Sequence, residues 1–276
     1  MTKSLTVSFW GTRGSYPQSG LGYVKTGGHT SCVSLQTPEH TLFFDAGTGL
    51  ITAGSEGSGA TGDEKSRYHI LLSHLHLDHI LGIPFFKPLW IPETQVHFYT
   101  GMLESSEALN KALSTIFSPP YFPASWEAIP AKCTYHTFHS GKTFNIGTVL
   151  VRSVALRHPG GATGYRVEVG GKSVVYLTDT CHPLDQDDTF AQFCDAADLL
   201  IYDATFTTES WKQHPDWGHS TWYEGCQLAR RAGVRQLALF HHAPEHTDTI
   251  LDDILRQAQE VFPAAFLAHD GHSLSL

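Results

Sequence analysis

Four side chains of metal-binding type fall within six residues, directly after a short apolar run. The run, YHILLS at residues 68–73, has the length expected of a buried strand, and HLHLDH begins immediately after it. This hexapeptide supplies His74, His76, Asp78 and His79. Imidazole and carboxylate groups together suit zinc and related first-row metals, and a tight loop can splay them around more than one ion. The sequence therefore predicts a metal site at the end of a strand.

Strand-like and helical patterns alternate along the rest of the chain. The strand-like segments are residues 5–11, 31–37, 41–47, 96–101, 148–156, 164–179, 197–204 and 236–240, with a hairpin turn at Gly170-Gly171. Helical spacing occurs over residues 103–116, 221–232 and 249–261. Strands followed by helices, twice over, predict an α/β chain that forms a four-layer αββα sandwich. We expect residues 1–276 to form a single domain, with a surface loop at residues 54–65.

Composition excludes several classes of protein. Apolar residues make up 41% of the chain, which is ample for a core, and the formal net charge is −9 with no long basic run. An extended nucleic-acid partner is therefore not expected. The N-terminal residues 1–9 resemble a strand rather than an export signal, and no apolar stretch is long enough to cross a bilayer. The five cysteines contain no C-x-x-C pair, so reduced thiols in the cytoplasm are the expectation, with Cys181 of interest because it lies close to Asp179.

An aromatic segment rich in proline occupies residues 117–126, with the sequence FSPPYFPASW. Its prolines exclude regular structure and predict a stiff loop. The aromatic side chains either line a pocket, in which case Tyr121 and Phe122 are candidate substrate contacts, or cover an edge of the core. The sequence leaves both interpretations open.

The metal-binding hexapeptide resembles the H-x-H-x-D-H motif of the metallo-β-lactamase superfamily, and later residues follow in that superfamily's order across nearly the whole chain. These are His158 in LRHPGG, Asp179 in YLTDT and His241 in LALFHH, with His242 as a rival for His241. The resemblance implies two divalent metal ions, one held by His74, His76 and His158 and the other by Asp78, His79 and His241. Asp179 would bridge them, because two close cations need a shared anion. Nitrogen-rich ligation favours zinc, with manganese as the alternative.

Further motifs resemble the phosphodiesterase side of that superfamily, which includes tRNase Z and cyclic-phosphate hydrolases. They are FWGTRGS, FFDAGTG, LLIYDATF and GHST. Asp45 would orient a metal-binding imidazole, and Asp203 would pair with His219, which could donate a proton to the leaving oxygen. Asp203 stands where the familiar motif has glutamate, which puts the pairing distance in doubt. Ser220 and Thr221 either contact the same anion or cap the following helix.

The predicted function is hydrolysis of a small cyclic phosphodiester or a nucleotide through a metal-bridging hydroxide, with Asp78, His219 and Asp203 as catalytic candidates. A lactonase or thioesterase type of carbonyl hydrolase is the alternative, because the ligand set alone cannot exclude it. A tRNA 3′-processing endonuclease ranks lower. Such relatives carry a long arm between the third histidine motif and the bridging aspartate, whereas 20 residues separate His158 from Asp179 here. A homodimer is implied by relatives only.

Overall fold

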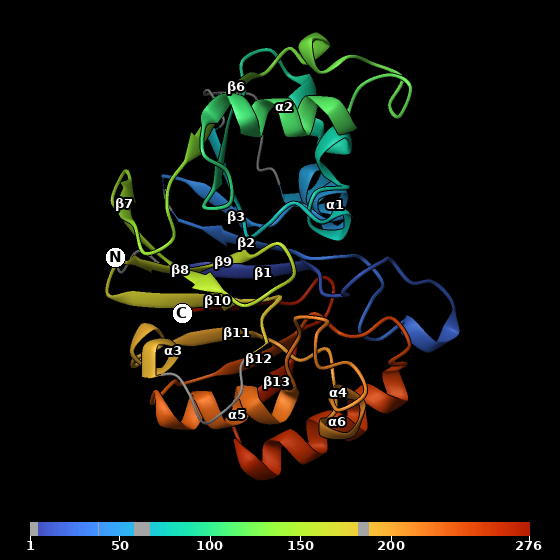
Figure 1. The fold of residues 1–276 in the computed structure, drawn as a ribbon, viewed down its shortest axis with the longest axis vertical. Coiled ribbons are helices and arrows are strands. Elements are labelled where there is room, and N and C mark those ends of the chain that lie inside the picture. The colour runs from blue at the N-terminus through green and yellow to red at the C-terminus, as the bar shows by residue number, and fades with distance from the viewer. Residues whose placement is uncertain (1–4, 38, 58–66, 182–187) are drawn as a thin grey trace.

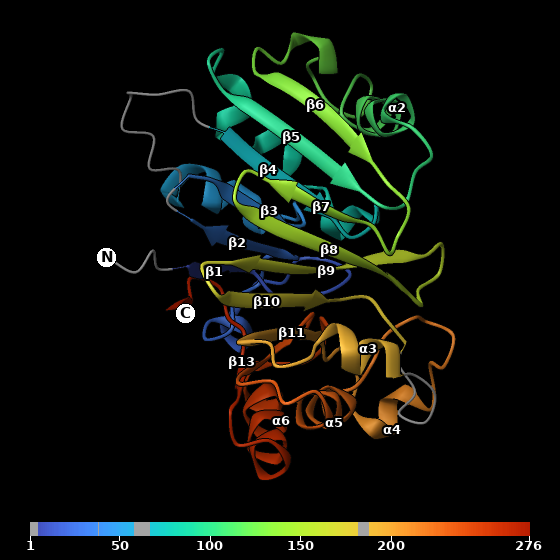
Figure 2. The ribbon, with the colours of Figure 1, turned by 90° about the vertical axis from the view of Figure 1, so that its left-hand side faces the viewer.

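The computed structural model describes residues 5–37, 39–57, 67–181 and 188–276. Two seven-stranded sheets pack face to face, and helices cover their outer faces (Figure 1). The side view shows α2 beside β5 and β6, and α5 and α6 beneath β11 and β13 (Figure 2). The predicted four-layer αββα sandwich is therefore confirmed. That the chain forms a single domain stays a prediction.

The first sheet is built mainly by the N-terminal half of the chain and has the order β14-β1-β2-β3-β4-β5-β6. Strands β3 to β6 run parallel, so their carboxyl ends share one edge of the sheet. The strands of this sheet are β1 (Thr6–Gly11), β2 (Cys32–Gln36), β3 (Thr41–Phe44), β4 (Arg67–Leu72), β5 (Gln95–Thr100), β6 (Lys132–Thr137) and β14 (Ser273–Ser275).

The second sheet has the order β13-β12-β11-β10-β9-β8-β7. Strands β10 to β13 are parallel, and β8 and β9 form an antiparallel hairpin beside β10. Strand β8 therefore points the same way as β10, and its carboxyl end lies at the same edge. The strands are β7 (Thr143–Ile146), β8 (Val149–Leu156), β9 (Ala162–Val169), β10 (Lys172–Leu177), β11 (Leu199–Asp203), β12 (Leu237–Phe240) and β13 (Ala265–Leu267).

The outer layers consist of amphipathic helices whose apolar faces pack on the sheets. Ser105 caps α2 by accepting a hydrogen bond from the Ala108 N–H (3.2 Å), and for this reason the helix starts three residues later than the spacing of residues 103–116 predicts. The helices are α1 (Gly49–Thr52), α2 (Ser106–Ile116), α3 (Asp188–Phe193), α4 (Thr208–Trp211), α5 (Trp222–Arg231) and α6 (Asp248–Val261). None of the helices in the described residues combines the length and the apolar character that crossing a bilayer requires.

A buried apolar layer between the two sheets joins both halves of the chain. The rings of Phe44 and Tyr176 stack in it with centroids 4.8 Å apart, one ring from each sheet. Removing one such side chain from water contributes about 1.5–3 kcal/mol to stability. Similar buried clusters lie under α2 and above α5 and α6. Residues attached to the strand ends are therefore held by a rigid support on both sides.

Three local predictions can be compared with the structure: the surface loop at residues 54–65, the N-terminal strand and the hairpin turn at Gly170-Gly171. The surface loop predicted for residues 54–65 begins instead as a helical turn over Ala53–Gly57, and its remaining residues lie outside the described part of the chain. Residues 1–4 of the predicted N-terminal strand also lie outside it, and the strand itself is β1. The predicted hairpin turn at Gly170-Gly171 is confirmed, since both glycines have positive φ angles (60° and 79°), as a tight two-residue turn requires.

Candidate metal centre

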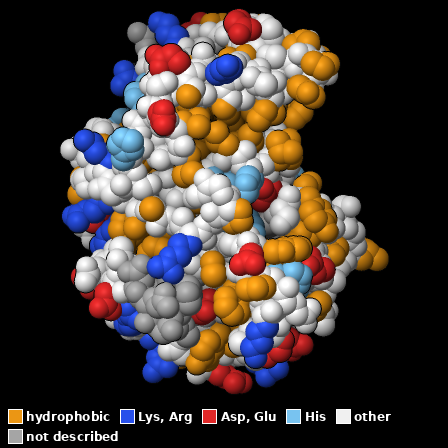
Figure 3. Space-filling view, in the orientation of Figure 1, with side chains coloured by type: hydrophobic (Ala, Val, Ile, Leu, Met, Phe, Trp, Pro, Cys, Tyr) orange, Lys and Arg blue, Asp and Glu red, His pale blue; other side chains and the backbone are white. Residues whose placement is uncertain are grey.

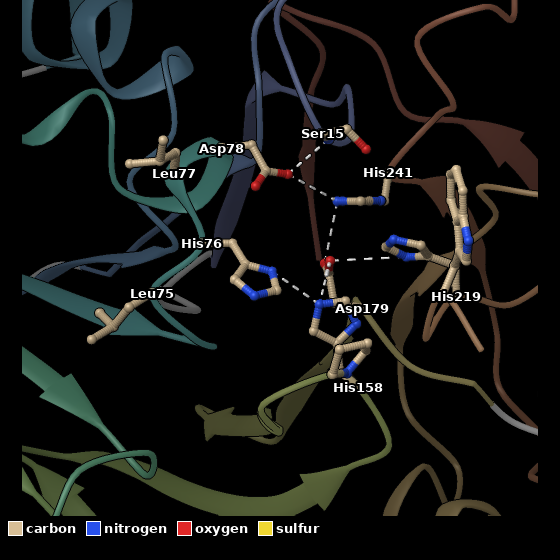
Figure 4. Close-up of a pocket in the computed structure, with 11 residues that line it drawn as sticks. Ser15, Leu75, His76, Leu77, Asp78, His158, Asp179, His219 and His241 are labelled. Atoms are coloured by element: carbon tan, nitrogen blue, oxygen red, sulfur yellow. Dashed lines mark hydrogen bonds and ion pairs between the residues drawn. The ribbon is translucent and has the colours of Figure 1, made fainter.

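The metal-binding side chains predicted from the sequence converge at the edge where the carboxyl ends of the strands meet. The loop after β4 supplies the hexapeptide residues, while β8, β10 and β12 are followed by His158, Asp179 and His241. Figure 4 shows several of these side chains pointing toward one another around a shared space. The convergence follows from the parallel arrangement, because loops at the carboxyl ends of such strands face the same crevice.

The first group of possible ligands consists of His74, His76 and His158. One nitrogen of each lies within 4.8 Å of the others, and His76 Nδ1 is 3.1 Å from His158 Nε2. Burial lowers the pKa of both His74 and His158, so these imidazoles are neutral and offer lone pairs. Neutral imidazole nitrogens at this spacing are suited to one shared cation.

The second group consists of Asp78, His79 and His241, whose donor atoms also lie within 4.8 Å of one another. Asp78 Oδ2 is 3.2 Å from His79 Nε2 and 3.4 Å from His241 Nε2. Burial opposes ionisation of Asp78, but the neighbouring His79 and His241 keep the pKa of this carboxyl well below its ordinary range. The group therefore presents an anion together with two imidazoles.

Asp179 lies between the two groups, with a different oxygen facing each. Its Oδ1 is 3.9 Å from His74 Nε2 and 3.7 Å from His158 Nε2. Its Oδ2 is 3.2 Å from His79 Nε2 and 3.3 Å from His241 Nε2. A carboxylate so placed can contribute one oxygen to each of two cations, which is the arrangement of a dinuclear centre.

Buried nitrogen atoms without partners support this interpretation. Among the described residues, Nε2 of His74, of His79 and of His241 is buried and has no hydrogen-bond partner. An unsatisfied buried polar atom costs about 1–3 kcal/mol, and most proteins avoid it. Here the lone pairs face the carboxylates of Asp78 and Asp179, where a divalent cation would satisfy both. The residues present therefore fit two divalent metal ions.

The other ring nitrogen of nearly every candidate ligand is held by a hydrogen bond. His79 Nδ1 donates to Asp45 Oδ2 (2.7 Å), and His74 Nδ1 donates to the hydroxyl of Ser73 (3.0 Å), which itself donates to Asp45 (2.8 Å). His158 Nδ1 donates to the carbonyl of Gly218 (3.0 Å). Such contacts fix the tautomer and would direct the free nitrogen toward a bound metal ion.

His241 is held in the same way. Its Nδ1 donates to the hydroxyl of Thr205 (2.9 Å), which donates to Asp203 Oδ1 (2.7 Å). Its rival His242 points elsewhere, with Nε2 donating to the carbonyl of Ala268 (2.9 Å). Between the two adjacent histidines, the structure therefore brings His241 to the other candidate ligands.

Asp203 and His219 form the predicted pair beside this centre. His219 Nδ1 donates to Asp203 Oδ2 at 3.0 Å and lies 3.9 Å from Asp179 Oδ1. Burial alone would lower the pKa of His219, but the carboxylate of Asp203 raises it to about 9. The shorter aspartate therefore reaches the histidine without difficulty, although a glutamate is familiar at this position in the resembling motif.

Several strand ends adopt the left-handed backbone conformation that favours glycine. Asp45, Asp179 and His241 have φ angles of 56°, 57° and 56°. Each costs of order 1 kcal/mol or more and persists only where surrounding contacts hold it. Glycine would avoid this strain but would provide no ligand or orienting carboxylate, so the side-chain chemistry accounts for the strain.

The N-terminal glycine-rich turn packs directly on the second group. The Ser15 N–H donates to Asp78 Oδ2 (2.8 Å), and a Cβ on Gly14 would lie 2.3 Å from the His241 ring. The fully buried Arg13 anchors the turn, since its guanidinium donates to the carbonyls of Gly27 (2.9 Å) and His246 (2.6 Å). The turn therefore positions Asp78 by backbone contact.

A cavity of about 450 Å³ opens over the two groups. Figure 3 shows histidine side chains near the middle of this face, with hydrophobic side chains on either side of them. Its lining residues are Ser15, Leu75, His76, Leu77, Asp78, His158, Pro159, Asp179, Trp217, His219 and His241. Among the described residues that line it, none is lysine or arginine. This is where a substrate would meet the centre.

Four predicted contact residues lie elsewhere than expected. Tyr121 and Phe122 do not line this cavity, and Phe122 packs instead against Phe85, with ring centroids 5.7 Å apart. Ser220 and Thr221 direct their hydroxyls to Glu224, in hydrogen bonds of 2.5 Å to its carboxylate and 3.1 Å from its backbone N–H. The helix-capping interpretation of Thr221 is therefore confirmed. Cys181 is half-buried, and burial raises the pKa of its thiol, so it is not a reactive thiolate.

The sequence analysis missed the residues that act through hydroxyls and backbone groups. Ser73, Thr205 and Gly218 each accept a hydrogen bond from the imidazole of a candidate ligand, and Tyr176 donates its hydroxyl to Asp45 (2.8 Å). Ser73 directly precedes the hexapeptide and Gly218 directly precedes His219, and this adjacency was the available signal. Thr205 and Tyr176 carry no local signal.

The fold and the candidate ligand set together define a metal-dependent hydrolase of the metallo-β-lactamase fold. The family model described as the beta-lactamase superfamily domain matches residues 40–242, and the chain belongs to this family. Ribonuclease Z from Haloferax volcanii is 29% identical over 322 aligned residues, covering 99% of this chain and 95% of the relative. That alignment is longer than the 276 residues of the chain, so the relative carries segments that this chain lacks.

Solved structures give the same fold. The metallo-beta-lactamase fold protein YhfI from Bacillus subtilis superposes with a TM-score of 0.73 at 21% identity, covering 99% of this chain and 100% of that protein. A diphosphatase from the PhnP family superposes with a TM-score of 0.71 at 20% identity, covering 99% of this chain and 98% of that one. At such identity both likenesses concern the fold alone.

Proposed function

We propose that this hydrolase is a phosphodiesterase that acts on a small cyclic phosphodiester or a nucleotide. The observation that carries the proposal is the buried Asp203–His219 pair beside the candidate metal ligands. Because Nδ1 of His219 is bonded to Asp203 at 3.0 Å, Nε2 is the nitrogen left to face the cavity that the ring lines. A histidine fixed in this way is suited to donate a proton to an alkoxide leaving group.

In this proposal the residues divide into those that hold cations and those that handle the proton. One divalent cation would be held by His74, His76 and His158, the other by Asp78, His79 and His241, with Asp179 shared. Bound there, the cations would supply an activated water and offset the charge that develops on phosphorus. Zinc suits the nitrogen-rich set best, and manganese is the alternative.

His219 then protonates the departing ester oxygen, and Asp203 keeps the ring oriented and stabilises its protonated form. The Ser15 N–H donates to Asp78 Oδ2 at 2.8 Å, and this is the oxygen that also faces His79 and His241. Asp78 therefore serves as a positioned ligand. Proton transfer by such a group contributes about 100- to 10,000-fold to rate.

A small substrate is favoured by the surroundings of the cavity. The segment between His158 and Asp179 is occupied by β9, the tight turn at Gly170-Gly171, and β10. The net charge is −9, and among the described lining residues there is no lysine or arginine that could track a polyphosphate backbone. A substrate carrying a single negative charge fits this cavity better than a polyanion does.

The test compares two diesters that differ in leaving group. Zinc- or manganese-loaded protein would be assayed on adenosine 2′,3′-cyclic phosphate, on bis(p-nitrophenyl) phosphate and on a lactone. His219→Ala should lose at least about 100-fold on the cyclic phosphate, whose alkoxide needs a proton, and much less on p-nitrophenolate, which leaves unprotonated. His139→Ala, at an exposed histidine after β6, is the matched control and should keep wild-type rates.

Other outcomes would contradict the proposal in distinct ways. Equal losses on both diesters would show that His219 is not the proton donor. Hydrolysis of the lactone without either diester would show a carbonyl hydrolase instead. The presence of a homodimer, implied by relatives only, stays a prediction for light scattering.

A second candidate function is tRNA 3′ processing, because the relative from Haloferax volcanii that spans nearly the whole chain is named Ribonuclease Z. Incubation with a precursor tRNA that carries a 3′ trailer distinguishes the two. Release of the trailer at rates comparable to those of the cyclic phosphate would replace our first proposal with this one.

A further inference from the structure

We propose that Trp217 is a stacking platform for an aromatic group, namely the nucleobase, of the substrate. This inference rests on the proposed phosphodiesterase function and names its substrate class. Trp217 lines the cavity over the candidate metal ligands, yet 61% of it is exposed to solvent. A large aromatic side chain left open at the mouth of a polar site offers its face to a ligand, because stacking there removes apolar area from both partners.

The indole is held in place before any ligand arrives. Its ring centroid lies 4.3 Å from that of His214, and the backbone N–H of Trp217 donates to the backbone carbonyl of His214 at 3.2 Å. His214 in turn stacks on Phe206 (5.3 Å, 10°) and donates Nδ1 to the Ser210 carbonyl (3.0 Å) at the end of α4. A side chain already ordered loses little conformational entropy on binding, so its contact contributes more fully to affinity.

The position of Trp217 relative to the centre is fixed by the chain. The next residue, Gly218, accepts the hydrogen bond that orients His158, and the following one, His219, faces the cavity. Gly218 has a φ angle of 76°, and a Cβ there would lie 2.3 Å from Pro159. The backbone of this segment is therefore closely packed against the loop that follows β8. The platform therefore stands a fixed distance from both the ligands and the proton donor.

The opposite side of the cavity is apolar. Leu75 and Leu77 line it, and Leu77 is 54% exposed. Figure 4 shows both leucines across the ligands from His219. A flat base between an indole and aliphatic side chains, with no lysine or arginine among the described lining residues, matches a nucleoside cyclic phosphate with one negative charge. A sugar phosphate without a base would leave the indole uncovered.

The experiment uses two cyclic phosphates that differ only in the base. Adenosine 2′,3′-cyclic phosphate is compared with 1-O-methylribose 2′,3′-cyclic phosphate. Both carry the same ribose and the same cyclic phosphate, so a difference between them reports on the base. Trp217→Ala in the metal-loaded protein should raise KM for the adenosine substrate about 10-fold or more, with kcat unchanged, since stacking acts equally in ground and transition states. Kinetics on the base-free substrate should stay as in wild type.

Two further variants test whether the effect comes from the aromatic ring at position 217. Trp217→Phe keeps a smaller ring and should raise KM for the adenosine substrate less than Trp217→Ala does. Trp90→Ala, at another exposed tryptophan that does not line this cavity, should leave both substrates unaffected. Equal losses on both substrates with Trp217→Ala would mean that the indole only positions Gly218 and His219, and this would overturn the proposal. No change on either substrate would overturn it as well.

A failure of the proposed function gives a different pattern. If the wild-type protein hydrolyses neither cyclic phosphate, the phosphodiesterase proposal is wrong. Calorimetric binding of adenosine 3′-monophosphate and of inorganic phosphate then tests stacking on Trp217 independently of catalysis. Tighter binding of the nucleotide that is lost in Trp217→Ala supports stacking. Equal binding of the two ligands, or a preference that survives Trp217→Ala, refutes it.

Discussion

Replacing Asp45 by asparagine should weaken both metal binding and the fold, although the side chain touches no substrate. Asp45 is fully buried and accepts from four donors: the Ser73 N–H (2.7 Å), the Ser73 hydroxyl (2.8 Å), His79 Nδ1 (2.7 Å) and the Tyr176 hydroxyl (2.8 Å). Asparagine keeps the shape of the side chain but has one accepting oxygen. Its amide nitrogen must therefore face a donor in either orientation.

The size of the loss in unfolding free energy depends on which donor loses its hydrogen-bond partner. With the amide oxygen toward His79, the amide nitrogen meets the backbone N–H of Ser73, which cannot turn away. One buried N–H and the amide hydrogens are then unpaired, at about 1–3 kcal/mol for each group. We expect the metal-free variant to lose about 2–6 kcal/mol of unfolding free energy. Since His79 then donates to a neutral oxygen, its basicity falls, and metal affinity should drop about 10- to 100-fold.

Two measurements check this prediction. Urea unfolding of the metal-free proteins gives the change in unfolding free energy, and competition with a chromophoric chelator gives the zinc affinity. Asp253→Asn is the matched control, because Asp253 is an exposed aspartate on α6. Wild-type zinc affinity in Asp45→Asn would refute the idea that this carboxylate organises the ligands, whatever the effect on stability.

Three other predictions concern a glycine, the metals and a distant carboxylate. Gly218→Ala should displace His158, because the added Cβ would lie 2.6 Å from His158 Nδ1. Metal titration should then show an affinity about 10- to 100-fold weaker at one of the two sites. Gly233→Ala, at another glycine of positive φ, is the control and should keep wild-type affinity at both sites. Chelation of the metals should lower the thermal midpoint reversibly, because cations at about 1,000 times Kd contribute about 4 kcal/mol, and an unchanged midpoint would contradict the ligand assignment. Asp198 has a pKa below its ordinary value of 3.8: burial opposes this, but the Ser173 N–H, Lys172 and Arg235 favour the carboxylate. The ionised Asp198 therefore contributes its full share of the unfolding free energy above pH 3.8, and this contribution is lost as the pH falls through the folded-state pKa. The difference in urea midpoint between wild type and Asp198→Asn should be constant near neutral pH and should shrink in acid.

The sequence predicted the candidate ligands better than the contacts that orient them. Histidine and aspartate at strand ends carry a recognisable chemical pattern, and the strands that precede them are apolar and buried, so their position could be deduced. A hydroxyl or carbonyl that orients an imidazole leaves no such pattern. Thr205, for example, is an ordinary β-branched residue in the sequence, and its importance lies in contacts with His241 and Asp203 that only the folded chain creates.

The strands that could not be predicted lie at the edges of the two sheets. Strand β6 (Lys132–Thr137) alternates between exposed and half-buried residues, so it lacks the apolar run that reveals a buried strand. The short strands β13 and β14 fall below the length at which a pattern is visible. The aromatic residues at 117–126 left two interpretations open because apolar side chains next to proline suit a core edge as well as a pocket wall, and for Phe122 the structure shows packing on Phe85.

The strongest coupling between fold and site runs through the space between the sheets. Tyr176 packs its ring on Phe44 of the other sheet and donates its hydroxyl to Asp45, which holds His79 and, through Ser73, His74. Any sliding of one sheet over the other would therefore break the hydrogen bonds that aim both groups of ligands. Because Asp45 also has a left-handed backbone, held by the same contacts, the geometry of the centre depends on the packing of the whole sandwich. It follows that Tyr176→Phe, which keeps the ring but removes the hydroxyl, should lower zinc affinity while leaving the stacking intact, whereas a purely structural role for Tyr176 would leave zinc affinity unchanged.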